Sequence, residues 1–184
     1  MKKLMIAAAI VCAAAFAQAA SIDWSVTANT WTLSDGSKAP TGTTVYLINA
    51  AAWDTIESAI AGGKTSFTTA DTGILAVGAT SNTKGYIGKS TASSSTLTAG
   101  TQYDFAYLVL NGDEYFASGT MKSGAYDTAD PTYSDPKAIA FGSTQFSSAN
   151  SLSGGWQTAS VPEPTSAMLL VLGIAGLALR RRRA

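Results

Sequence analysis

Two apolar segments, one at each end of the chain, restrict the folded domain to the residues between them. Residues 1–20 begin with two lysines, continue as an uncharged apolar stretch and end in small residues, which is typical of a secretory signal peptide. Ala17 and Ala19 form a small-x-small motif, so we expect Sec-type export and cleavage before Ala20 or Ser21. The alternative is an uncleaved anchor, but the apolar stretch is short for that.

The C-terminal segment, residues 161–184, joins an apolar run to a basic end. Ser166 to Leu179 has no charged residue, but it falls short of the ~20 residues that usually cross a bilayer. Its flanks favour a transmembrane helix over a soluble one, because Pro164 suits a first helical turn and clustered arginines mark the cytoplasmic side. The clustered arginines are Arg180, Arg181, Arg182 and Arg183.

The start of this segment, Val161, Pro162, Glu163 and Pro164, together with the apolar helix and the arginines, resembles the PEP-CTERM sorting signal. The resemblance implies recognition by an exosortase, which is a membrane-embedded transpeptidase, and processing near Pro-Glu-Pro. It also implies a transient stage at the inner membrane of a Gram-negative-type bacterium, and then delivery to the cell surface or the exopolysaccharide matrix. It implies nothing about the activity of the exported domain.

The exported region is acidic and lacks several reactive side chains. Its basic residues are six lysines, with no arginine, against eleven Asp and Glu, so nothing favours nucleic-acid binding. The chain has no histidine, and its one cysteine, Cys12, lies in the signal segment. Disulfides, thiolate or histidine metal sites and Ser-His-Asp triads are therefore excluded from the exported region. We expect neither a cofactor nor catalysis, with a hydrolase that uses only Asp and Glu as the alternative.

Residues 21–146 are expected to form an antiparallel β-sandwich or a jelly-roll-like domain with one short helix. The best strand signal is Thr101 to Leu110, whose alternating aromatic residues precede an Asn111-Gly112 hairpin turn. The helix is expected to follow Asn49 as its cap and to end at Gly62-Gly63, with Trp53, Ile56 and Ile60 on one face. The other predicted strands are 24–33 (one or two strands), 43–48, 66–69, 74–79, 86–87, 114–122 and 138–146.

Three stretches are expected to lack regular structure. Ser90 to Ser95 is a Ser/Thr-rich stretch that favours a loop, and residues 123–136 are turn-rich and acidic. Residues 147–160 form a Ser/Gly linker before the C-terminal segment, and its Trp156 either docks on the domain or stays free.

Several short patterns are candidates for chemistry. Asp71-Thr72-Gly73 matches the aspartic-protease triplet, but it lacks the usual apolar lead and is also an ordinary turn. Asp127, Asp130 and Asp135 are weak candidates for a calcium site, against the simpler reading of a solvated acidic loop.

Threonine pairs could form an ice- or glycan-facing array, and tryptophans could form platforms on which sugars stack, although ordinary β surface and core packing explain them more simply. The threonine pairs are Thr30-Trp31-Thr32, Thr41-Gly42-Thr43 and Thr96-Leu97-Thr98, and the tryptophans are Trp24, Trp31, Trp53 and Trp156.

The pattern as a whole predicts a non-enzymatic surface or matrix protein, structural or weakly binding, with exopolysaccharide as a candidate partner. The main alternative is a binding module that stays anchored in the membrane and faces the periplasm.

Overall fold

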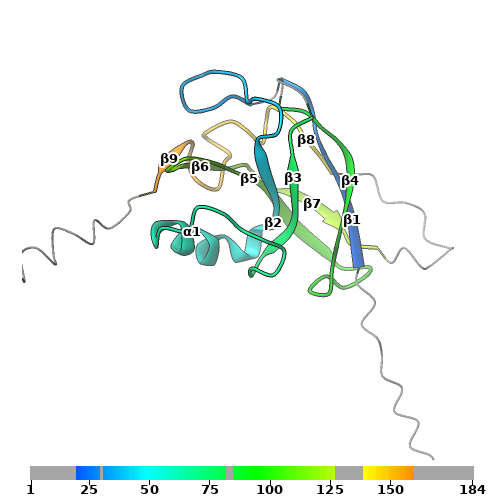
Figure 1. Ribbon diagram of the computed structural model, residues 1–184. Coiled ribbons are helices and arrows are strands. Elements are labelled where there is room, and N and C mark those ends of the chain that lie inside the picture. The colour runs from blue at the N-terminus through cyan, green and yellow to red at the C-terminus, as the bar shows by residue number, and fades with distance from the viewer. Residues whose placement is uncertain (1–19, 30, 82–84, 127–138, 160–184) are drawn as a thin grey trace, which may run out of the picture.

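The computed structural model describes residues 20–29, 31–81, 85–126 and 139–159. Over these residues the protein is mostly β, with two sheets and one short helix (Figure 1). Apart from Ala20, the predicted signal segment lies outside these ranges, as does the predicted C-terminal helix. Within the described ranges, no helix has both the length and the hydropathy that a membrane crossing requires.

The smaller sheet has three strands in the order β4-β1-β8. Its central strand β1 (Ala20–Val26) pairs antiparallel with β4 (Ile87–Ser94) and parallel with β8 (Ile139–Phe141). The prediction of a purely antiparallel architecture is therefore wrong at β8. Parallel neighbours need a long crossover, and here most strands of the larger sheet lie between β1 and β8 along the chain.

The Ser/Thr-rich stretch at 90–95 was expected to be a loop, and this expectation is wrong for most of it, because β4 continues to Ser94. An edge strand needs only one apolar face, and Ile87 and Ala92 provide it while the hydroxyl side chains mostly face outward. The Ser21 and Ser93 hydroxyls, on paired strands, lie 2.7 Å apart and share a hydrogen bond.

The larger sheet has six strands in the order β3-β2-β5-β6-β9, with β7 paired to β5 beyond the end of β6. Its strands are β2 (Thr44–Asn49), β3 (Ile74–Ala79), β5 (Gln102–Asn111), β6 (Glu114–Ala117), β7 (Met121–Gly124) and β9 (Gln157–Thr158). The predictions of strands at 43–48 and 74–79 are confirmed.

The strand β5 shows the predicted alternation. Phe105, Tyr107 and Val109 point toward the smaller sheet, while Ala106 and Leu108 point to the opposite face. The predicted turn follows at Asn111 and Gly112, where Gly112 has a φ of 66°. The expected hairpin is confirmed.

The returning strand predicted at 114–122 is interrupted, giving β6 and β7 with Ser118 to Thr120 between them. The amide of Gly119 turns away from the sheet and donates to the Gln145 carbonyl at 2.6 Å. A Cβ at Gly119 would lie 2.7 Å from the Asn150 carbonyl oxygen, so the loop packs directly on this glycine. A close backbone approach therefore explains the break.

Three other predicted strands are shorter or absent. β1 ends at Val26, so Trp31 and Leu33 lie beyond it, and β8 stops at Phe141. Residues 66–69 form no strand, because the Thr68 amide donates to the Asp71 carboxylate at 2.8 Å in a turn.

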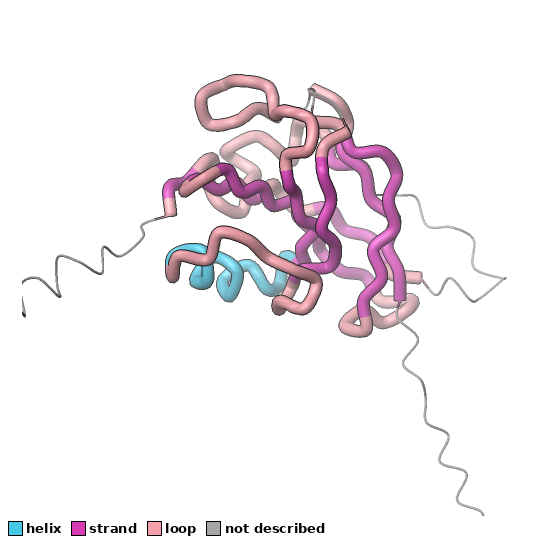
Figure 2. Tube along the Cα trace, viewed as in Figure 1, coloured by secondary structure: helices cyan, strands magenta, loops and turns pink. Residues whose placement is uncertain are grey.

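The predicted helix is confirmed. The Asn49 side chain accepts from the Ala51 amide at 3.1 Å, a 3-10 turn η1 (Ala50–Ala52) follows, and α1 (Trp53–Ala61) continues from it to the cap at Gly62. Trp53, Ile56 and Ile60 are buried at helical spacing. Figure 2 shows the helix beside the larger sheet, on the side away from the smaller one.

Two hydrophobic clusters result from this arrangement. The sheet core lies between the two sheets and includes Ile22, Trp24, Leu47, Phe105 and Phe141. The helix core lies between α1 and the other face of the larger sheet and includes Tyr46, Ile48, Trp53, Ile56, Ile60 and Leu108. β2 and β5 supply side chains to both cores, which explains why their sequences are almost continuously apolar.

Candidate functional site

The chain leaves the folded domain directly before the predicted sorting residues. β9 pairs with β6 through Glu114–Thr158 and Tyr115–Gln157, and the Ala159 amide donates to the Asp113 carbonyl at 2.6 Å. Only Ser160 separates Ala159 from Val161. The predicted sorting residues themselves, from Val161 to Arg183, lie outside the described residues.

The predicted signal cleavage site adjoins the first strand. Ala17 and Ala19 lie outside the described residues, but Ala20 is buried and pairs with Ser94. Ser21 exchanges two backbone hydrogen bonds with Tyr126, at 2.6 and 2.9 Å. Cleavage before Ala20 would keep every pair of β1, whereas cleavage before Ser21 would remove the first.

The Asp71-Thr72-Gly73 triplet forms a turn. The Asp71 carboxylate accepts from the Lys64 ammonium and from the Thr68 amide, and the hydrogen bond from Lys64 is the main reason that the pKa of Asp71 lies below its ordinary value. Gly73 has a φ of 82°, and a Cβ there would lie 2.3 Å from the Ala52 Cβ. The triplet thus fits the loop against the start of the helix.

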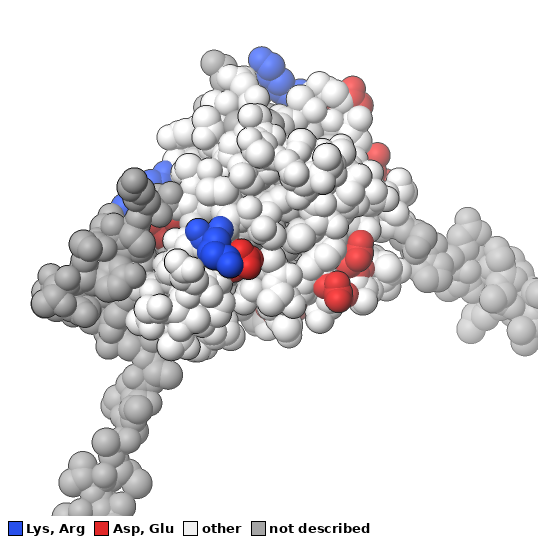
Figure 3. Space-filling model, turned by 180° about the vertical axis from the view of Figure 1, so that it is seen from behind, with Lys and Arg blue, Asp and Glu red and all other residues white. Residues whose placement is uncertain are grey.

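The candidate calcium ligands Asp127, Asp130 and Asp135 lie outside the described residues. Within the described ranges, no group of three or more His, Cys, Asp or Glu side chains is placed to hold a metal ion. Charged side chains are sparse and scattered on the face seen in Figure 3.

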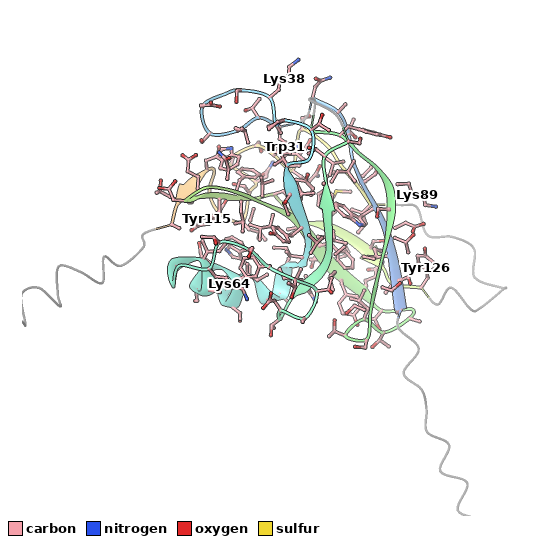
Figure 4. All side chains as sticks on the ribbon, viewed as in Figure 1. Trp31, Lys38, Lys64, Lys89, Tyr115 and Tyr126 are labelled. Atoms are coloured by element: carbon pink, nitrogen blue, oxygen red, sulfur yellow. The ribbon has the colours of Figure 1, made fainter. Side chains whose placement is uncertain are left out.

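One carboxylate, Asp23 on β1, is buried with charged and polar partners. Its oxygens accept from the Lys89 ammonium at 2.7 Å and from the Thr91 hydroxyl at 2.6 Å. Burial alone would raise the pKa of Asp23, but hydrogen bonds from Lys89, Thr91 and Tyr126 outweigh it and hold this pKa below the ordinary value. Figure 4 shows Lys89 and Tyr126 beside β1, so this cluster stabilises the smaller sheet.

The threonine pairs do not form a common strand face. Trp31 and Leu97 at the centres of two pairs are buried off the strands, Gly42 lies in a turn with a φ of 85°, and Thr30 is outside the described residues. Trp24 and Trp53 belong to the two cores. Trp156 is half-buried, so of the two alternatives it docks on the domain and does not stay free.

Four aromatic side chains from distant parts of the sequence form one wall of a surface cavity of about 270 Å³. The rings of Trp31 and Phe146 are stacked with centroids 6.0 Å apart, Phe116 and Phe146 are stacked at 5.9 Å, and Trp156 lies 5.7 Å from Phe116. We call this cavity the aromatic pocket. Trp31 reaches it from the loop between β1 and β2 (Figure 4).

Two tryptophan N–H groups fix the rings of the aromatic pocket. The Trp156 indole donates to the Thr32 carbonyl at 3.1 Å, and the Trp31 indole donates to the Gly85 carbonyl at 3.2 Å. Because the N–H groups are already used, these two side chains offer the pocket only their ring surfaces and edges.

The polar part of the aromatic pocket consists of Asn29, Thr32 and Ser148. Their side chains make no hydrogen bond within the described part of the chain. Asn29 has a φ of 60°, and no other non-glycine residue among those described has a positive φ. Asparagine tolerates this conformation in turns, and Asn29 lies in a turn after β1.

Sequence reasoning singled out Trp31 and Trp156, but not their association or the parts played by Phe116, Phe146 and Asn29. The available signal was Trp156 itself, since a large aromatic residue in a Ser/Gly-rich stretch needs a packing partner. The partner loop lies more than a hundred residues earlier, at Thr32, and no local pattern connects the two.

Comparison with known proteins gives information about one end of the chain. No curated protein and no solved structure matches it. A family model described as the PEP-CTERM protein-sorting motif matches residues 160–183, which include all the predicted sorting residues. The chain therefore carries a PEP-CTERM protein-sorting motif at its C-terminal end, the mark of an exported bacterial protein that an exosortase sorts.

Proposed function

We propose that this protein is a non-enzymatic component of the bacterial cell surface or extracellular matrix, released from its C-terminal helix by an exosortase. The observation that carries the proposal is the sorting motif at residues 160–183. The signal-like segment at residues 1–20 supports it, because export must precede sorting.

The position of the motif relative to the fold supports the same proposal. The described domain ends at Ala159, and the motif begins at the next residue. Removal of the C-terminal segment after Pro164 would leave both sheets and both cores intact.

The absence of histidine from the whole sequence supports a non-enzymatic role, because it excludes the commonest general base. Asp71, the residue of the protease-like triplet, is already committed to Lys64 and to its own turn. The described lining of the aromatic pocket includes no carboxylate, so it offers a ligand no acid–base pair.

Intact-mass measurement of the protein from an exosortase-containing host tests the proposal. We expect a mature mass that lacks the segment before Ala20 or Ser21 and also lacks the C-terminal arginines. The Pro162→Ala/Pro164→Ala double variant should keep the arginines and stay in the membrane fraction, because the motif is disrupted while the apolar run is unchanged. Asp71→Asn is the matched control, lies in the domain and should be processed normally.

The alternative is a binding module that stays anchored in the membrane. A mature wild-type protein that still carries Arg180 to Arg183 would overturn sorting by cleavage and favour this alternative.

A further inference from the structure

We propose that the aromatic pocket binds one ring of a neutral saccharide. The inference goes beyond export and sorting, and it does not depend on whether the C-terminal segment is removed. It rests on the ring surfaces, the polar side chains, the size of the pocket and the absence of charged side chains from its described lining.

The ring surfaces favour a ligand with a flat apolar face. Phe146 and Trp156 are half-buried and line the pocket, with Trp31 and Phe116 packed beside them. A pyranose ring presents several axial C–H bonds on one face, and such a face packs on an aromatic ring. The fixed orientation of Trp156, through its bond to Thr32, lowers the entropy lost on binding.

The polar groups favour a ligand that carries hydroxyls around its rim. The Asn29 amide can both donate and accept, as can the hydroxyls of Thr32 and Ser148. None of these three side chains is used in a hydrogen bond within the described residues. Sugar hydroxyls are donors and acceptors in the same way, so the two sets complement each other.

The charge and the size of the pocket narrow the ligand class. Among the residues that the structure describes, no Lys, Asp or Glu lines it, and the exported region has no arginine, so the described lining has no cation to pair with a uronate or a sulfate. Its volume of about 270 Å³ is just below the ~300 Å³ at which pockets for drug-sized ligands begin. One ring fits this space, and the rest of a chain would lie outside it.

Binding of oligosaccharides to the mature protein, followed by tryptophan fluorescence and by calorimetry, tests the proposal. The neutral probes are cellohexaose and maltohexaose, and trigalacturonate is the acidic probe. We expect at least one neutral probe to bind with a dissociation constant on the order of 1 mM, and trigalacturonate to bind at least about tenfold more weakly.

Three variants separate the site from the fold. Asn29→Gly keeps a residue suited to a φ of 60° but removes the amide, and one lost hydrogen bond should weaken binding about fivefold. Ser148→Ala should have a similar effect, and Trp156→Ala should weaken binding about tenfold or more by removing a ring. Tyr86→Ala is the matched control, because Tyr86 is a 40% exposed aromatic residue outside the pocket.

Several outcomes would overturn the inference. One is the failure of wild-type protein to bind either neutral probe, and another is an equal loss of binding in Tyr86→Ala and the pocket variants. A third is displacement of the neutral probes by a peptide with the sequence of residues 160–165. If this peptide binds the pocket more tightly than either neutral probe, the pocket is assigned to a proline-containing ligand instead. Each result is independent of the intact-mass experiment, so the failure of one proposal leaves the other standing.

Discussion

The sheet core and the helix core differ in how they are closed off from solvent and in whether their buried polar atoms have partners. The helix core is closed along one side by α1, and its tyrosines have partners: Tyr46 accepts from the Phe67 amide, and Tyr115 donates to Glu57. The sheet core is larger and contains two buried polar atoms with no partner among the described residues, Trp24 Nε1 and Tyr107 Oη. It also continues through Trp31 and Phe146 to the surface, at the aromatic pocket.

This difference shows that the two faces of the larger sheet have different roles. The helix side completes the packing of the domain, whereas the sheet side also supplies the aromatic residues of the candidate binding site. Tyr107 connects the sheet core to the aromatic pocket. Its ring contacts Trp24 in the core, and it also contacts Trp31 and Phe146, which line the pocket.

The largest expected effect is the loss of a side chain from the sheet core. Phe105 is fully buried between the sheets, and Phe105→Ala should lower the free energy of unfolding by about 3–5 kcal/mol. Ile56→Ala in the helix core should fall near the lower end of about 2–5 kcal/mol, because α1 covers only one side and can shift inward. Urea unfolding measures both, and a larger loss for Ile56→Ala would reverse the ranking of the cores.

A second prediction concerns the loop that packs against the start of the helix. Gly73→Ala places a methyl group 2.3 Å from the Ala52 Cβ. We expect this overpacking to lower the free energy of unfolding by about 1–3 kcal/mol, in addition to the cost of a positive φ. Gly36→Ala is the matched control, because Gly36 has a φ of 80° and open space around it. If thermal unfolding shows the same loss of stability in both variants, backbone strain, and not the contact with Ala52, accounts for the effect.

A third prediction compares two ion pairs, Asp23 with Lys89 in the smaller sheet and Asp71 with Lys64 beside the helix. The Asp23 pKa lies below its ordinary 3.8, so its stabilising contribution is complete above that pH and is lost as the pH falls through the lower folded value. Asp23→Asn should therefore lower the melting temperature at pH 7 and reduce the further decrease between pH 4 and pH 2.

The Asp71 carboxylate provides the comparison, because its pKa is also lowered while its side chain is 27% exposed against 3% for Asp23. Solvent screens the exposed pair, so Asp71→Asn should change the melting temperature less at either pH. An equal acid sensitivity of the two variants would contradict the assignment of Asp23 as the more important carboxylate.

The smallest expected effect comes from the unpartnered hydroxyl of Tyr107. Burial raises the pKa of Tyr107 far above its ordinary range, so the hydroxyl stays neutral and contributes only the cost of its burial. Tyr107→Phe should therefore leave stability unchanged or raise it by up to about 1 kcal/mol. Tyr46→Phe should lose up to about 1 kcal/mol instead, because the Tyr46 hydroxyl accepts from Phe67. A marked loss in Tyr107→Phe under urea would show that the hydroxyl has a partner in solution.

The local parts of the fold could be predicted from the sequence. The helix and its cap were predicted from Asn49 together with Trp53, Ile56 and Ile60. The hairpin was predicted from the aromatic alternation in β5 and the Asn111-Gly112 turn. These patterns work because the residues that form each contact lie within a few positions of one another.

Features that depend on distant partners could not be predicted. β4 is rich in serine and threonine, and it forms a strand because β1 pairs with it some seventy residues earlier. β8 pairs parallel to β1 after most of the chain has intervened, and the break at Gly119 depends on Asn150. The sorting motif was predictable for the opposite reason, since its three parts are contiguous.

The two-residue strand β9 has a mechanical consequence. Any pull on the sorting motif enters the domain at Ala159, the residue before it, and then acts on the two ladder pairs between β9 and β6. Trp156, whose indole donates to the Thr32 carbonyl, comes directly before β9. Tension on the C-terminal end therefore reaches the edge of the helix core at Ala159 and Tyr115, and it reaches the wall of the aromatic pocket at Trp156. Load on the C-terminal end and occupancy of the aromatic pocket therefore act on the same side chain, Trp156.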